Sequence, residues 1–185
     1  SASQLPPASG YAAVVSGSCS LATNAQVQHW IDAGRPALPI DLLALADGQD
    51  LVSHTLNWAQ PLIAQGPVLV YATANPSAVK AIQSALGAQC AGELVEHALS
   101  SIARGLVNMG VGQMVVAGGE TSGAVVQALG VDRMIIGPQI DPGVPWTCVR
   151  PSVAPGRYVH VALKSGNFGG QDFFVKAFTL LKDKP

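Results

Sequence analysis

Residues 114–129 read Met-Val-Val-Ala-Gly-Gly-Glu-Thr-Ser-Gly-Ala-Val-Val-Gln-Ala-Leu, and this stretch decides how the fold is interpreted. The apolar run at 114–117 predicts a buried strand, and 124–129 predicts a helix. Between them, the glycine turn at 118–123 opens the helix. Turns of this kind leave backbone N–H groups free at the positive end of a helix dipole. The stretch therefore predicts an anion site, and phosphate is the expected anion.

Outward from this stretch, short apolar runs alternate with helical patterns. Strands are expected at 11–15, 37–42, 68–72, 113–117, 133–136 and 158–163, and helices at 24–33, 51–65, 76–86, 91–109, 124–129 and 171–181. Such alternation implies right-handed crossovers between parallel strands. We therefore predict an α/β fold, a three-layer αβα Rossmann-like domain with a mainly parallel sheet. Pro39 makes its strand an edge candidate, and Pro61 is expected to end, kink or start a helix.

Composition excludes several classes of partner. The 185 residues carry a formal net charge of −1, which gives no electrostatic case for nucleic acids or anionic membranes. Apolar runs fall short of the roughly 20 residues that span a bilayer. The three cysteines are widely separated in the sequence and do not have the spacing of metal ligands. Such cysteines are typical of a reducing compartment, so the protein is expected in the cytoplasm. Of these, Cys90 and Cys148 are expected in or near the core.

Four loops are predicted to converge on one edge of the sheet. They are the segments 16–20, 73–75, 118–123 and 164–170, all rich in Gly, Ser, Thr or Asn. Each follows a predicted strand, and the carboxyl ends of parallel strands share one edge, where ligands bind in open α/β sheets. One such loop could be a simple turn, but four on one edge favour a binding site.

Several side chains in the predicted loops and turns have more than one possible role. Lys164 follows the last strand and is either a solvated surface lysine or a functional cation. Asp172 suits a helix cap, or a carboxylate that accepts a hydroxyl proton during phosphoryl transfer. Glu120 could hold Mg²⁺ through water, bond a ribose or accept N–H groups. Trp146, in a turn at 141–146, could cover a core edge or stack on a base. The catalytic residue is unknown, with Asp172 and Lys164 as weak candidates.

Several familiar signatures are missing from the sequence. There is no Walker glycine-lysine motif and no dinucleotide fingerprint after the first strand. Ser122 is one residue out of register for a hydrolase nucleophile elbow. The four histidines are scattered without ligand spacing.

Four motifs in order resemble a known family. They are Ser-Gly-Ser-Cys-Ser at 16–20, Gly-Gly-Glu-Thr-Ser-Gly at 118–123, Ile-Asp-Pro-Gly-Val-Pro-Trp at 140–146 and Leu-Lys-Ser-Gly-Asn-Phe-Gly-Gly at 163–170. Together they resemble the C-terminal nucleotide-binding domain of the four-carbon acid sugar kinases over residues 11–181. Members are two-domain bacterial enzymes that phosphorylate threonate, erythronate or 3-oxo-tetronate with ATP, and this chain looks closest to the 3-oxo-tetronate kinases.

The resemblance implies where ATP and Mg²⁺ would bind. In the family ATP lies against the C-terminal domain, and its contacts would fall on Ser16, on 118–121 and on the loop near Gly166. The full set of expected nucleotide-binding residues is Ser16, Gly17, Ser18, Gly118, Gly119, Glu120, Thr121, Ser122, Gly166 and Asn167. A metal site built from protein ligands is not expected.

The resemblance also implies that half of the enzyme is missing. Residues 1–10 are expected to be a linker from an absent N-terminal domain that binds the sugar acid, and 11–185 the nucleotide-binding domain. The isolated chain is then expected to be inactive, because positioning both substrates supplies most of phosphoryl-transfer catalysis. A homo-oligomer is an open option. Two other hypotheses stand: a non-catalytic module that binds a phosphorylated metabolite at the same edge, and an oxidoreductase domain, the weakest of the three.

Overall fold

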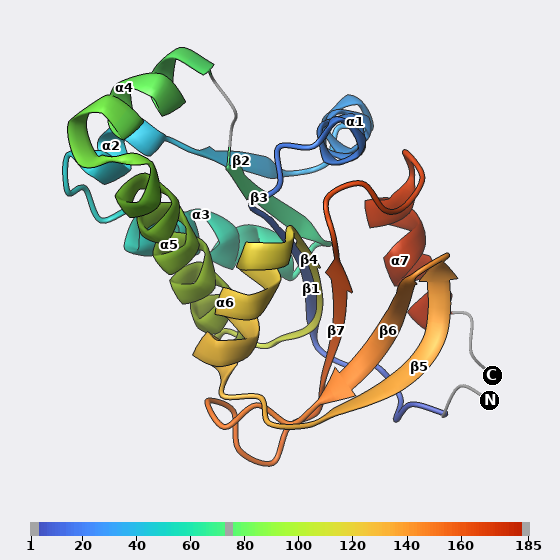
Figure 1. The fold of residues 1–185 in the computed structure, drawn as a ribbon. Coiled ribbons are helices and arrows are strands. Elements are labelled where there is room, and N and C mark those ends of the chain that lie inside the picture. Colours follow the sequence, from blue (N-terminus) through green and yellow to red (C-terminus); the bar gives the residue numbers. More distant parts are fainter. Residues whose placement is uncertain (1–3, 73–75, 183–185) are drawn as a thin grey trace.

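The computed structural model describes residues 4–72 and 76–182. Within these residues, one seven-stranded sheet has the order β2-β3-β1-β4-β7-β6-β5 (Figure 1). The strands are β1 (Tyr11–Ser16), β2 (Ala37–Ile40), β3 (Val68–Ala72), β4 (Val111–Ala117), β5 (Met134–Asp141), β6 (Val144–Val149) and β7 (Val159–Lys164). The helices are α1 (Leu21–Asp32), α2 (Leu42–Ala46), α3 (Leu51–Ile63), α4 (Pro76–Leu86), α5 (Ala88–Asn108), α6 (Gly119–Leu129) and α7 (Phe173–Lys182).

The sheet is mainly parallel, as predicted. β2, β3, β1, β4 and β7 run parallel to their neighbours, whereas β6 pairs antiparallel with both β7 and β5. The carboxyl ends of β1, β4 and β7 therefore lie next to one another, because Ser16 pairs with Ala117 and Ala117 pairs with Lys164. Pro39 lies on β2, which is an edge strand as expected.

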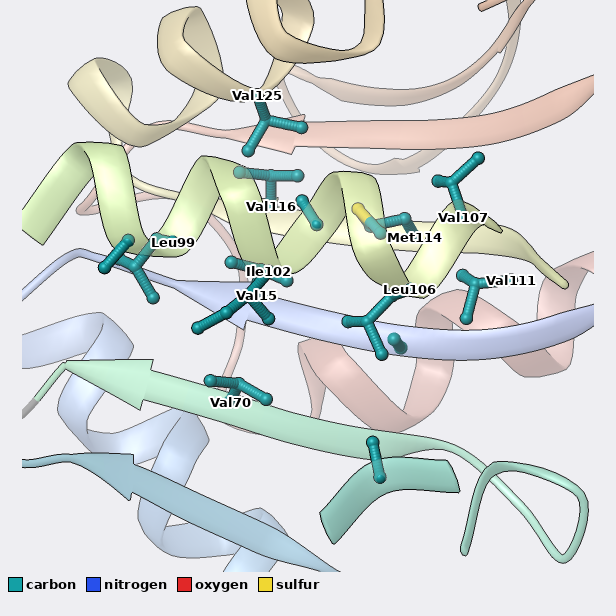
Figure 2. Close-up of a cluster of buried hydrophobic side chains, with 14 of the residues drawn as sticks. Val15, Val70, Leu99, Ile102, Leu106, Val107, Val111, Met114, Val116 and Val125 are labelled. Atoms are coloured by element: carbon teal, nitrogen blue, oxygen red, sulfur yellow. The ribbon is translucent and has the colours of Figure 1, made fainter. Parts of the chain in front are cut away.

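Helices cover both faces of the sheet (Figure 1). On one face α5 packs over β1, β3 and β4, and α3 and α6 lie beside it. Figure 2 shows the centre of this layer, where Leu99, Ile102 and Leu106 of α5 meet Val15 and Val116 of the sheet. These α5 residues recur at helical spacing, so a single apolar stripe buries the helix.

The opposite face is covered by α1 and α7. Trp30 of α1 and Phe173 of α7 are fully buried there, in one hydrophobic cluster with Val115 of β4. Trp146 of β6 is also fully buried, and its indole N–H donates to the carbonyl of Ala177 at 2.9 Å. The core interpretation of Trp146 is therefore confirmed.

Strand β6 was not predicted from the sequence, because prolines lie in and next to it. The stretch at 141–146 was predicted to be a turn, but only Pro142 and Gly143 connect β5 to β6. Gly143 has φ +83°, which suits the tight reversal. Pro138 and Pro145 lie within the two strands, whose register shifts near Gln139. Proline is unusual inside a paired strand because it cannot donate a ladder hydrogen bond. Here the irregular register of the β5–β6 pair accommodates both prolines.

Three further predictions need correction. Residues 41 and 42 do not extend β2, because Asp41 caps α2 by accepting the N–H groups of Leu43 and Ala44. Helix α6 begins at Gly119 instead of residue 124, so most of the predicted glycine turn is helix. Cys90 is exposed on α5, while Cys148 is buried as expected.

Candidate functional site: a loop edge beside an apolar cavity

Three of the four predicted loops meet at the carboxyl ends of β1, β4 and β7. The N–H of Gly17 donates to the carbonyl of Ala117 at 2.9 Å. The N–H of Gly118 donates to the carbonyl of Lys164 at 2.8 Å. These bonds continue the sheet pairing into the loops, so each loop is held to its neighbour. The fourth loop, 73–75, lies outside the described residues.

The first turn of α6 has the geometry of an anion site. Gly118 precedes the helix with φ +116°, a conformation that favours glycine. The helical ladder starts with the N–H of Ser122, which donates to the carbonyl of Gly118 at 2.9 Å. The N–H groups of Gly119, Glu120 and Thr121 precede it and have no acceptor within the helix. Gly119 and Glu120 are exposed, so an anion can reach these donors.

Gly17 and Thr121 fit closely where the β1–α1 loop meets the first turn of α6. A Cβ added to Gly17 would fall far inside 3.0 Å of the Thr121 Oγ1 atom, so a larger residue would displace that side chain. The Thr121 hydroxyl, which is buried, donates to Glu96 Oε1 at 3.1 Å. This contact brings α5 into the site.

Glu96 is a site residue that sequence analysis missed. Burial raises the pKa of its carboxyl and the negative charge of Glu120 raises it further, although the hydrogen bond from Thr121 acts in the opposite direction. Its Oε2 atom is buried and has no hydrogen-bond partner in the described part of the chain. The sequence contained only a weak indication that Glu96 faces the protein interior. It lies one helical turn before Leu99 and Ser100, on the face of α5 that is buried.

A hydroxyl cluster of Ser18, Ser20 and Thr23 holds the loop after β7. The Ser20 and Thr23 hydroxyls donate to the carbonyl of Gly166 at 2.6 and 3.0 Å. Ser20 also caps α1 by accepting the N–H of Thr23. The Ser18 and Thr23 Oγ atoms lie 3.0 Å apart. The predicted residues Ser18 and Gly166 are therefore brought together by one local network.

Gln26 anchors the next part of the same loop and was not predicted. It is buried on α1, and its side-chain amide donates to the carbonyls of Phe168, Gly169 and Gly170 at 3.0–3.1 Å. From the other side, Asp141 accepts the N–H of Gly170 at 3.1 Å. The glycine-rich loop is thus fixed from both α1 and the end of β5.

Lys164 is fully buried, so the interpretation of this residue as a solvated surface lysine is wrong. Its ammonium donates to Thr23 Oγ1 at 3.0 Å, to the Gly166 carbonyl at 2.8 Å and to the Ser165 carbonyl at 3.3 Å. Burial lowers the pKa of Lys164 to about 8. A cation therefore lies beneath the junction of the loops.

An apolar cavity opens beside the anion site. Its volume is about 220 Å³, and its polar side includes Gly17, Glu96 and Glu120. The apolar side is lined by Leu42, Leu45, Ala72, Val79, Ile82, Leu94 and Val95. The cavity reaches the first turn of α6 at Glu120 and the β1–α1 loop at Gly17, so one elongated ligand can occupy both the cavity and the anion site.

The remaining predicted residues lie at different depths. Ser16 is buried, and neither its Oγ nor that of Ser122 has a hydrogen-bond partner among the residues the structure describes. Asn167 is exposed on the loop after β7. Asp172 is exposed directly before α7, and its backbone carbonyl accepts the N–H groups of Val175 and Lys176. Its role as a cap or as a proton acceptor stays a prediction.

Metal and membrane features are not found in the described part of the chain. No group of three or more His, Cys, Asp or Glu residues within 4–72 and 76–182 could hold a metal ion. In the same residues, no helix is both long and apolar enough to cross a bilayer.

Comparison with known proteins gives consistent matches. The model of a nucleotide-binding C-terminal domain family matches residues 13–174. Similar sequences include 3-oxo-tetronate kinases of Pseudomonas fluorescens, 56% identical over 95% of this chain, and of Burkholderia multivorans, 54% identical over 97%. These matches cover 40% and 41% of the relatives, so the chain spans about two fifths of their length.

Solved structures share the fold. A crystal structure of a Haemophilus influenzae protein matches with a TM-score of 0.83 and 37% identity over 96% of this chain and 42% of that one. A second match is a crystal structure of a Bordetella bronchiseptica domain, a domain-swapped dimer with bound citrate. It has a TM-score of 0.70 and 20% identity, and the match covers 95% of this chain and 42% of that one. At this identity the match shows the fold alone. With residues 13–174 matched by the family model, the chain belongs to the nucleotide-binding C-terminal domain family.

Proposed function

We propose that this chain is the ATP-binding part of a kinase that phosphorylates a four-carbon sugar acid. The observation that carries the proposal is the first turn of α6, where the N–H groups of Gly119, Glu120 and Thr121 have no acceptor within the helix. Phosphate oxygens are suited to such donors, which lie at the positive end of a helix dipole. In this proposal the turn binds phosphates of ATP or ADP.

The cavity beside this turn suits the nucleoside. Its apolar walls match the faces of a purine base, and its volume of about 220 Å³ leaves room for a planar ring. Glu96 provides an acceptor at the polar side, because its Oε2 atom has no partner among the described residues. We therefore propose that the base enters the cavity and the phosphates extend past Gly17 to α6.

Mg²⁺ would enter together with the nucleotide. Mg²⁺ usually binds through one or two carboxylates, substrate phosphates and water. The exposed carboxylate of Glu120, in the first turn of α6, fits this partial ligand set. When bound, the ion would neutralise charge on the phosphates.

The sugar acid is proposed to be 3-oxo-tetronate, because relatives of about 50–56% identity bear the name 3-oxo-tetronate kinase. We propose that it binds to a domain that precedes this one in the full-length protein, and that residues 1–10 form part of the connection. Kinase activity then requires both domains, because catalysis of phosphoryl transfer depends on positioning.

Isothermal titration of the chain with Mg-ADP and Mg-ATP tests the nucleotide assignment. We expect binding below millimolar concentration. Tighter binding of a phosphorylated sugar acid than of either nucleotide would instead favour the non-catalytic module, and no binding of either nucleotide would reject the proposal.

A pair of variants tests the α6 donors themselves. Gly119→Pro removes one N–H at the first helical position, where proline is tolerated. Gly119→Ala keeps that N–H and places its Cβ in open space. Because a hydrogen bond to a charged group contributes about 1.5–3 kcal/mol, the proline variant should bind ADP roughly 10- to 100-fold more weakly than the alanine variant. Equal affinities would contradict the placement of phosphate.

A further inference from the structure

Lys164 connects all three described loops of the site. Its carbonyl accepts the N–H of Gly118, the residue that precedes α6. Its ammonium donates to Thr23 of the hydroxyl cluster and to the carbonyl of Gly166. One residue at the end of β7 therefore contacts the start of α6, the start of α1 and the β7–α7 loop.

The charge of Lys164 has no counter-charge in the described protein. All three hydrogen-bond acceptors of its ammonium are neutral oxygens. The one ion pair formed by described residues joins Lys176 to Asp141 instead. Removing an ammonium from water is unfavourable unless an opposite charge compensates it. A negative ligand at this edge would supply that charge, and Coulomb attraction is strong where water is excluded.

We propose that Lys164 is a positioning residue of the nucleotide site, holding the loops through its neutral acceptors while the phosphates of the bound nucleotide balance its charge. This inference rests on the proposed function and adds a role for the buried ammonium. It implies that nucleotide binding and protonation of Lys164 stabilise each other, because linkage between two ligands is reciprocal.

The sign of the pH dependence follows from this linkage. Burial lowers the pKa of Lys164 to about 8 in the free protein. A bound anion favours the ammonium form, so binding above pH 8 must first return a proton to the amine. ADP affinity should therefore be nearly constant from pH 7 to 7.5 and fall by up to about tenfold per pH unit above 8.

The elements around Lys164 carry other titratable and charged groups. On the β1–α1 loop, burial raises the pKa of the Cys19 thiol from its ordinary value of 9.0. On α6 the nearby carboxylate is Glu120, and the ends of β5 and α7 carry the Asp141–Lys176 pair. Cys19→Ser is the control for the thiol, and its binding should keep the wild-type midpoint.

The test is ADP titration calorimetry from pH 6.5 to 9.5 in buffers of different ionisation enthalpy. The wild-type chain should take up about half a proton per ADP near pH 8. Lys164→Met removes the ammonium and should bind weakly without this uptake. Thr23→Val removes one acceptor of the ammonium, so its midpoint should move to lower pH, which keeps the proposal testable if Lys164→Met does not fold.

Each outcome decides one question. Proton uptake by the wild type that Lys164→Met loses supports the proposal, as does a lowered midpoint in Thr23→Val. ADP binding without proton uptake, or uptake that survives Lys164→Met, overturns the role of Lys164 alone. Absence of ADP binding at every pH overturns the proposed function as well.

Discussion

Substitution of Gly17 by alanine should destabilise the chain by disturbing α6. A Cβ at this position would overlap Thr121 Oγ1 far inside 3.0 Å and would meet Leu99 Cδ1 at 3.0 Å. The Thr121 side chain cannot move freely, because it is buried and donates to Glu96. The methyl group must therefore displace Thr121 and, with it, the first turn of α6.

The expected cost combines two effects. Overpacking in a filled site costs about 1–3 kcal/mol, and loss of the Thr121–Glu96 hydrogen bond adds about 1 kcal/mol. The two costs together amount to about 2–4 kcal/mol. For a chain of this length, each kcal/mol lowers the melting temperature by about 2–4 °C, so a decrease of about 4–16 °C is expected. Urea unfolding measures the same change as a free energy of unfolding.

Two further variants make this prediction specific. Gly123→Ala, on the next turn of α6, places its Cβ where no atom lies within 4 Å, so it should leave stability unchanged or raise it by up to about 1 kcal/mol. In the double variant Gly17→Ala with Thr121→Ala, the overlapping hydroxyl is gone, and a coupling energy of about 1 kcal/mol or more is expected. Gly17→Ala as stable as Gly123→Ala would refute the reasoning.

Three other substitutions test single contacts. The folded state holds the Glu96 pKa above its ordinary value, so ionisation of this carboxyl destabilises the fold. Glu96→Gln should therefore have a higher melting temperature than wild type above about pH 5 and the same melting temperature near pH 4. A difference in melting temperature that does not change with pH would contradict this. The pKa of Asp141 is lowered, chiefly by its hydrogen bond from Lys176, so the stability lost in Asp141→Asn should shrink as pH falls from about 5 to 3 in acid unfolding. Trp146→Phe should cost about 2–4 kcal/mol in urea, since it leaves a gap in the core and removes the hydrogen bond from the indole N–H to the carbonyl of Ala177; a cost below 1 kcal/mol would argue against the buried packing.

Sequence patterns predicted the parts of the fold that local chemistry controls. The apolar stripe of α5 and the buried run of β4 have periodicities that a single window can reveal. Pro39 marked an edge strand because it cannot donate to a ladder. The β5–β6 hairpin was not predicted, since Pro138 and Pro145 lie in strands whose bulges arise only from pairing.

For the candidate site, too, sequence patterns predicted the features that depend on neighbouring residues and missed those that depend on distant contacts. The loops at Gly17, Gly118 and Gly166 were predicted to converge, because parallel strands end at one edge of a sheet. Gln26 and Glu96 were missed, because each contacts residues far away in the sequence and neither lies in a motif. Lys164 was ambiguous in sequence for a similar reason: its burial depends on α1 packing over the β7–α7 loop.

The most direct test of the nucleotide site is an amide NMR titration of the ¹⁵N-labelled chain with Mg-ADP. We expect the largest shifts at Gly17 and at residues 119–121, with smaller shifts at Gly166 because its loop joins the same network. Residues near His160 at the opposite end of the sheet should stay unchanged. Saturating ADP that shifts the region around His160 and leaves the first turn of α6 unchanged would contradict the account.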